Sequence, residues 1–259
     1  MTALNDIRQE LLRLARELGQ EARQLALLGE GNVSASCHDG TFWIKASGSS
    51  LATLDEAGVS RVRLEPVLEL LMHDHLDEQK IEAALLAARV DKAHKKPSVE
   101  TFFHAVCLSE GGARWVGHAH PLSANRILCS RLGARPFLGH LFPDAVVVCG
   151  KAPAVVPYVD PGFALAKAIR AELQRYQGVY GEPPKLLLLE NHGVTALGNS
   201  ATEVMNILLM TDKWARILWG SYALGGPSYL PTADVERIDR RLDEQHRRRE
   251  LVREGGADG

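Results

Sequence analysis

Four consecutive leucines, Leu186–Leu189, most strongly limit how this chain can fold. A short, wholly apolar run of this kind is typical of a strand buried on both faces, because an exposed face would carry polar residues at alternate positions. Such a strand requires other elements packed on both sides of its sheet. Predicted helices and strands alternate through the second half of the chain, which indicates a single α/β domain with a central sheet covered by helices.

The spacing of apolar residues predicts the individual elements. Helices are expected over residues 4–28, 61–72, 77–93, 121–131 and 201–222, and another is expected to open at Pro97 and Ser98. Strands are expected over residues 41–45, 115–119, 145–149, 154–156 and 186–189. Asp160 is expected to cap a helix that begins at Pro161 and runs to about Tyr176.

Composition excludes several classes of function. A net charge of −2 gives no general attraction to nucleic acid or to an anionic membrane, and no apolar run reaches the length of a membrane span. The Arg-rich stretch 237–253 carries nearly as many acids, so it is interpreted as a solvated helix face. The four cysteines form no CxxC pair, which favours a reduced, cytoplasmic protein; three of them, Cys107, Cys129 and Cys149, are expected in the core, and the fourth is Cys37.

Three histidines are candidates for a metal site. His118 and His120 lie two residues apart at the end of a predicted strand, so their side chains point to the same face. His192 follows the strand Leu186–Leu189. Three imidazoles with one position left open are typical of a catalytic zinc site, not of a closed structural one. A His-x-His pair alone is weak evidence, because such pairs are more often surface or core histidines.

Separated segments around these histidines strengthen the metal interpretation. In order along the chain they are Gly31-Asn32-Val33-Ser34, Ile44-Lys45-Ala46-Ser47-Gly48, Pro97-Ser98-Val99-Glu100, His118-Ala119-His120-Pro121 and Glu190-Asn191-His192-Gly193. Their order and spacing resemble the class II aldolase/adducin family over roughly residues 5–225. That family includes fuculose- and rhamnulose-phosphate aldolases, ribulose-phosphate 4-epimerases and methylthioribulose-phosphate dehydratases. The resemblance is greatest to the rhamnulose- and fuculose-phosphate aldolases.

The resemblance implies a fold and an activity. The fold would be a three-layer α/β domain with a mainly antiparallel sheet flanked by helices over residues 1–225, and residues 226–259 would form a charged helical tail. The activity would be that of a zinc-dependent lyase, which cleaves a phosphorylated ketose by retro-aldol chemistry through a metal-stabilised enediolate. The alternatives are a sugar-phosphate dehydratase, a 4-epimerase, or a non-catalytic adducin-like interaction module. Three imidazoles and a carboxylate suit zinc, but cobalt, manganese or iron could use the same ligands.

Residue roles also follow from the resemblance. His118, His120 and His192 would bind the metal, and Glu100 would be a fourth ligand or the catalytic base. The phosphate site would comprise Gly31, Asn32, Ser47, Gly48 and Ser98. The alternatives are that Glu100 only interacts with a helix dipole and that the other residues only form turns and caps. Val99 stands where the family's aldolases often have a second serine, and His104 is expected behind the site or in the core.

The proton donor and the assembly are less well specified. Fuculose-phosphate aldolases present a tyrosine from about the region of residue 140, but this chain has no tyrosine before Tyr158. His140, Tyr222 and Tyr229 are therefore the candidate donors. The resemblance implies a homotetramer with active sites at subunit interfaces. Bulky residues late in the predicted helix 201–222 would either face a partner subunit or pack on their own core: Trp214, Ile217, Leu218, Trp219 and Tyr222.

Overall fold

The computed structural model describes residues 2–241 together with residues 243 and 250. Seven strands form one sheet in the order β3-β2-β1-β4-β7-β6-β5. Neighbouring strands are antiparallel, except that β5 and β6 are parallel. The strands are β1 Asn32–Ser36, β2 Thr41–Lys45, β3 Val59–Arg63, β4 Trp115–Ala119, β5 Ala154–Val156, β6 Leu186–Leu189 and β7 Gly193–Gly198.

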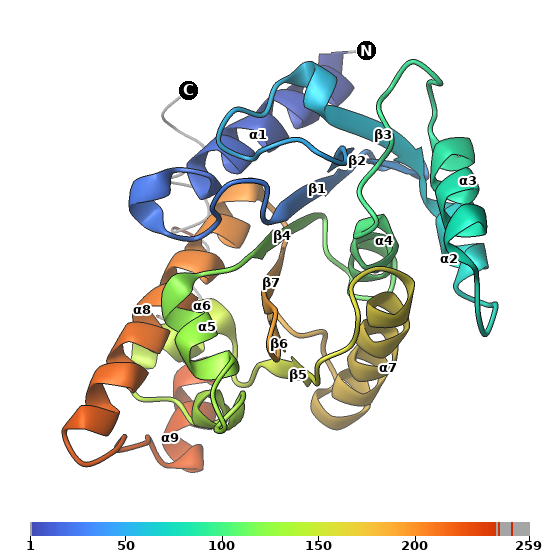
Figure 1. Cartoon of the computed structure of the whole chain (residues 1–259). Helices are drawn as coiled ribbons and strands as arrows, with labels where there is room; N and C mark the ends of the chain where they lie inside the picture. Colours follow the sequence, from blue (N-terminus) through green and yellow to red (C-terminus); the bar gives the residue numbers. More distant parts are fainter. Residues whose placement is uncertain (1, 242, 244–249, 251–259) are drawn as a thin grey trace.

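Helices cover both faces of this sheet and so create three layers (Figure 1). Helices α1, α5, α6 and α8 pack on one face, and α2, α3, α4 and α7 pack on the other. The α-helices are α1 Thr2–Leu18, α2 Leu64–Leu70, α3 Glu78–Ala88, α4 Thr101–Ser109, α5 Leu122–Leu128, α6 Pro143–Cys149, α7 Phe163–Tyr180, α8 Ala201–Ala223 and α9 Thr232–Arg240. Short 3-10 helices are η1 Glu21–Arg23, η2 Glu56–Gly58 and η3 Arg135–Leu138.

The leucine strand has the environment that its sequence predicts. Leu186 and Leu188 belong to the hydrophobic core on one face of the sheet, whereas Leu187 and Leu189 belong to the core on the other. Alternate side chains of a strand point to opposite faces, so four leucines in a row contribute to both cores. The predicted three-layer α/β fold with a mainly antiparallel sheet is confirmed.

The first helix is shorter than predicted. α1 ends at Leu18, and the predicted continuation to residue 28 is a 3-10 turn followed by loop. At Gly19 the backbone approaches Ala52 so closely that a Cβ atom would lie 2.2 Å from the Ala52 nitrogen. Leu25 is nevertheless fully buried. The loop therefore continues the apolar pattern of the helix, and that pattern alone could not locate the helix end.

The predicted strand over residues 145–149 is wrong, because this segment is helix α6. Pro143 occupies the first turn, where its missing N–H costs nothing. Val146 and Val147 then pack against Val235 and Ile238 of α9. Tertiary packing here outweighs the preference of valine for strands.

Several element boundaries also differ from the predictions. Residues 61–63 belong to strand β3, and α2 begins only at Leu64. α7 is preceded by Gly162, so Asp160 is not its cap. α4 begins at Thr101, three residues after Ser98, so the helix opens later than predicted. Cys129 is exposed, unlike Cys107 and Cys149, which are buried as predicted.

The end of the chain is described in part. α9 packs on α6 through Val235 and Ile238. Most of the Arg-rich stretch 237–253 lies outside the described residues, and the division at residue 225 stays a prediction. Among the described residues, no helix is both long and apolar enough to cross a membrane.

Candidate metal centre

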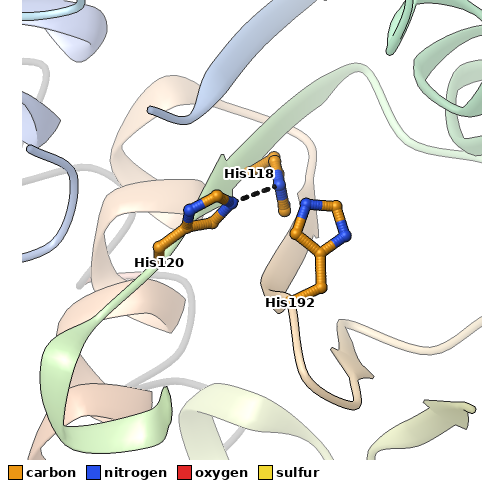
Figure 2. Close-up of side chains that lie close together, drawn as sticks. All are labelled: His118, His120 and His192. Carbon is orange, nitrogen blue, oxygen red and sulfur yellow. Dashed lines mark hydrogen bonds between the residues drawn. The ribbon is translucent and has the colours of Figure 1, made fainter. Parts of the chain in front are cut away.

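The sheet brings the three predicted histidine ligands together. His118 lies in β4, His120 directly follows β4, and His192 lies in the turn between β6 and β7. Because β4 pairs with β7, this turn is placed beside the end of β4. Figure 2 shows the three rings turned toward one another. Their centroids are 4.8 Å apart for His118 and His120, 4.8 Å for His118 and His192, and 5.0 Å for His120 and His192. One ring nitrogen from each histidine lies within 4.8 Å of the other two.

Polar contacts orient the first two rings. His118 Nδ1 lies 3.0 Å from the carbonyl oxygen of Val194 and 3.1 Å from Thr195 Oγ1. A protonated Nδ1 donates to that carbonyl and leaves the Nε2 lone pair free to bind a cation. His120 Nδ1 faces Glu30 Oε1 at 3.9 Å, and His120 Nε2 lies 3.0 Å from His118 Nε2. The two Nε2 atoms therefore converge.

The donor set fits a divalent metal ion. The ring nitrogen of His192 that faces His118 is Nε2, the nitrogen not bonded to Cγ (Figure 2), so the third imidazole also turns a nitrogen toward the cluster. Two nitrogens that bind one zinc ion tetrahedrally lie about 3.3 Å apart, close to the observed 3.0 Å between His118 and His120. The chemistry and the spacing of these nitrogens thus match those of a three-histidine metal site.

Burial keeps these imidazoles neutral, as metal ligands must be. Burial, together with the neighbouring His120, lowers the pKa of His192 to about 4. Burial likewise holds the pKa of His118 well below its ordinary value. The pKa of His120 is also lowered by burial, although Glu30 opposes this shift. At neutral pH all three rings therefore offer lone pairs.

Gly193 allows the two histidine segments to approach each other. A Cβ atom at this position would lie 2.5 Å from the carbonyl oxygen of Ala119 and 2.6 Å from Cδ2 of His120. Any side chain would push the His192 turn away from β4. The glycine that follows His192 is thus required by the geometry of the site.

Glu100 lies beside the histidine cluster. Its Oε1 atom is 3.4 Å from His118 Nε2, and its Oε2 atom accepts a hydrogen bond of 2.9 Å from Asn32 Nδ2. The side chain does not cap α4, so the alternative of a purely helix-stabilising role has no support from its contacts. Burial raises the pKa of the carboxyl, whereas Asn32 and Lys45 oppose that rise.

The residues predicted to bind phosphate fall into two groups. Ser47 and Ser98 lie side by side, because the Ser47 N–H donates to Lys96 and the Ser98 N–H donates to Lys45. Ser47 and the neighbouring Gly48 are exposed. Gly31 and Asn32 are buried next to the histidines, where the Asn32 amide is already bonded to Glu100. Their role in binding phosphate stays a prediction.

Lys45 is a feature of the site that the sequence interpretation missed. Its ammonium group donates to the carbonyl oxygens of Gly29 at 3.3 Å and Ser49 at 2.9 Å, and the residue is only 5% exposed. Burial lowers the pKa of Lys45, while the Glu100 carboxylate opposes this. A lysine directly after the apolar run Phe42-Trp43-Ile44 of strand β2 was the available signal, since lysine is almost never fully buried unless it is paired.

His104 lies behind the site, as predicted. It is fully buried, its Nδ1 is 2.7 Å from Ser34 Oγ, and its ring packs on Phe103. Phe103 in turn contacts the ring of His118 edge-on. Burial lowers the pKa of His104 to about 3. His104 therefore supports the aromatic packing behind His118 as a neutral ring.

The three candidate proton donors either contact residues outside the histidine cluster or are partly exposed. His140 is buried, stacks on Trp214, and its Nε2 lies 3.0 Å from the carbonyl oxygen of Lys151. The Tyr229 hydroxyl donates to Pro136. Tyr222 is 42% exposed in α8. These contacts give no support to proton donation within the same subunit, and the role stays a prediction.

Proteins with different activities are similar to this chain in sequence. The chain is 29% identical over 243 residues to the uncharacterized oxidoreductase YuxG of Bacillus subtilis; the match covers 88% of this chain, which spans only about a third (32%) of YuxG. It is 28% identical to a methylthioribulose-1-phosphate dehydratase of Microcystis aeruginosa, with 85% of this chain and 98% of that protein covered. It is 27% identical to a 3-oxo-tetronate 4-phosphate decarboxylase of Escherichia coli O6:H1, with 82% and 86% covered.

Solved structures and a family model agree with the fold. An L-fuculose 1-phosphate aldolase structure superposes with a TM-score of 0.70 at 19% identity, covering 92% of this chain and 96% of the other. At that identity the likeness establishes the fold alone. The model of the class II aldolase and adducin N-terminal domain matches residues 9–219, a span that contains Glu100 and all three clustered histidines. The chain belongs to the class II aldolase and adducin N-terminal domain family.

Proposed function

We propose that this chain is a zinc-dependent lyase that cleaves a phosphorylated ketose by retro-aldol chemistry. The observation that carries the proposal is the convergence of three neutral imidazoles with the Glu100 carboxylate beside them. His118, His120 and His192 would hold the cation. When bound, the cation supplies a Lewis acid for the negative charge that develops on the substrate carbonyl oxygen.

Glu100 is proposed to transfer the proton to and from the carbon next to that carbonyl. A raised pKa makes a carboxylate a stronger base at neutral pH. Burial raises the pKa of Glu100, and Asn32 holds its Oε2 atom so that Oε1 remains directed at His118. In the cleavage direction the same side chain, in its protonated carboxyl form, would return a proton to that carbon and become the carboxylate again.

Substrate phosphate is proposed to bind where the two loops meet. Ser47 and Gly48 offer exposed polar groups at this point, and Ser98 lies beside them on the neighbouring loop. The backbone N–H groups of Ser47 and Ser98 are used between the loops, so the Ser47 hydroxyl and the Gly48 N–H are the better candidate donors. Gly31 and Asn32 would border the phosphate on the side of the histidines.

A sugar-phosphate dehydratase is the second candidate. The observation that favours it is the similarity to the Microcystis aeruginosa dehydratase along 98% of that protein. A 4-epimerase or a decarboxylase would use the same site chemistry, because in each reaction negative charge develops on the carbon next to a carbonyl group. A non-catalytic adducin-like module is disfavoured, since the chain retains all three histidines and Glu100.

Product identification separates these reactions. Zinc-loaded protein is incubated with ketose 1-phosphates, methylthioribulose 1-phosphate and 3-oxo-tetronate 4-phosphate, and the products are identified by NMR. We expect dihydroxyacetone phosphate and an aldehyde from one of the ketose 1-phosphates, and no turnover after the metal is removed. Loss of water or of carbon dioxide from one substrate, with no aldehyde from any other, would reject the aldolase proposal and assign a related lyase activity.

We also propose that the chain forms a homotetramer. Trp214 and Leu218 pack in their own core, but Ile217, Trp219 and Tyr222 on the same helix are 39%, 57% and 42% exposed. We expect Trp219→Glu to lower the molar mass measured by light scattering, because a charge would have to be buried in the interface. Met72→Glu is the control, since Met72 is exposed beside α2 on the opposite face of the sheet. A monomeric, fully active wild-type protein would refute the proposal.

A further inference from the structure

We propose that Asn125 is a positioning residue, whose side-chain amide fixes His192 relative to His120. Asn125 lies in α5, and its Nδ2 atom donates a hydrogen bond of 3.0 Å to the backbone carbonyl oxygen of His192. The inference rests on the metal-dependent function proposed above. It concerns a residue that touches neither the candidate ligand nitrogens nor a substrate.

The helix that carries Asn125 begins at the second candidate ligand. His120 is followed by Pro121, and α5 starts at Leu122. The Asn125 N–H donates to the carbonyl oxygen of Pro121 at 2.9 Å, which closes the first turn of the helix. One helical turn and one side-chain hydrogen bond therefore connect the backbone of His120 to that of His192.

The His192 turn depends on such external support. Asn191 adopts a left-handed backbone conformation with φ of 57°, which costs energy for a residue other than glycine. Asn191 N–H donates to the carbonyl oxygen of Leu128 in α5 at 3.3 Å. The bond from Asn125 is the shorter of these two contacts from α5, and it acts on His192 itself.

The unpartnered half of the Asn125 amide shows what this side chain contributes. Its Oδ1 atom is buried and has no hydrogen-bond partner. A buried polar atom without a partner destabilises a protein, so an apolar side chain of similar shape would avoid that cost. An apolar side chain would, however, leave the His192 carbonyl oxygen without this hydrogen bond. The contribution of Asn125 therefore lies in the donor group that holds the His192 carbonyl.

Two substitutions test whether Asn125 positions His192 or only stabilises the fold. Asn125→Leu keeps a branched side chain and removes both polar groups, whereas Asn125→Ala removes the side chain. The matched control is Ser123→Ala, which deletes a hydrogen bond from α5 to Asp212 of α8 and leaves the His192 turn untouched. Zinc affinity is measured by competition with a chelator, the visible spectrum is recorded with cobalt, and thermal unfolding is followed without metal.

We expect both Asn125 variants to bind zinc 10–100-fold more weakly, which is the usual effect of losing a partner that orients a ligand. Their cobalt spectra should differ from that of the wild type, while Ser123→Ala should keep wild-type affinity and spectrum. Asn125→Leu should unfold at a temperature no lower than Asn125→Ala. Wild-type zinc affinity and spectrum in Asn125→Leu would overturn the positioning role. A wild-type protein that binds neither zinc nor cobalt would instead overturn the metal site itself.

Discussion

Replacing His192 by alanine is expected to remove most of the divalent metal from the purified protein. His192 is the candidate ligand that comes from a separate turn, and one of its ring nitrogens faces His118 (Figure 2). Without it, His118 and His120 remain, and two imidazoles hold a zinc ion far more weakly than three. The measurement is elemental analysis of wild type and variant, purified side by side.

The control for this experiment is His75→Ala, which removes an exposed histidine outside the cluster. It should leave the metal content unchanged. Full occupancy in His192→Ala would contradict the three-histidine site. The variant should remain folded, because the alanine removes a polar nitrogen that has no hydrogen-bond partner in the protein.

The sequence predicted the members of the histidine cluster better than their surroundings. Alternation along a strand places His118 and His120 on one face, and the leucine strand marks His192 as a residue at a strand end. The register that pairs His118 with Thr195 across β4 and β7 is a long-range property. Local sequence patterns do not contain it, and the family resemblance supplied only the grouping of the three histidines, not this register.

The misassigned elements share a physical cause. Residues 145–149 have the β-branched composition of a strand, but they fold as a helix because α9 and the core beneath α8 surround them. The burial of Lys45 was not predicted, because its position in a strand does not indicate which backbone carbonyls face its ammonium group. In both cases the deciding contacts come from segments distant in sequence.

Replacing Glu100 by glutamine is expected to slow proton transfer by roughly 10²–10⁴-fold while the protein stays folded. The amide has nearly the same shape as the carboxyl, and its oxygen can still accept the hydrogen bond from Asn32. It cannot take up a proton at neutral pH. Because burial disfavours the charged carboxylate, the neutral side chain should not lower the stability of the fold.

Deuterium exchange into dihydroxyacetone phosphate, or into the donor found in the substrate panel, measures this step without the full reaction. The variant must be compared at equal metal content, since Glu100 lies 3.4 Å from His118 and its loss could also weaken metal binding.

Glu110→Gln is the matched control, because Glu110 ends the same helix and pairs with Arg170, remote from the histidines. It should exchange at the wild-type rate. If metal-loaded Glu100→Gln also exchanges at that rate, the base is another residue. Lys45 would then be the first group to test, because burial lowers its pKa and so favours the neutral amine that could accept a proton.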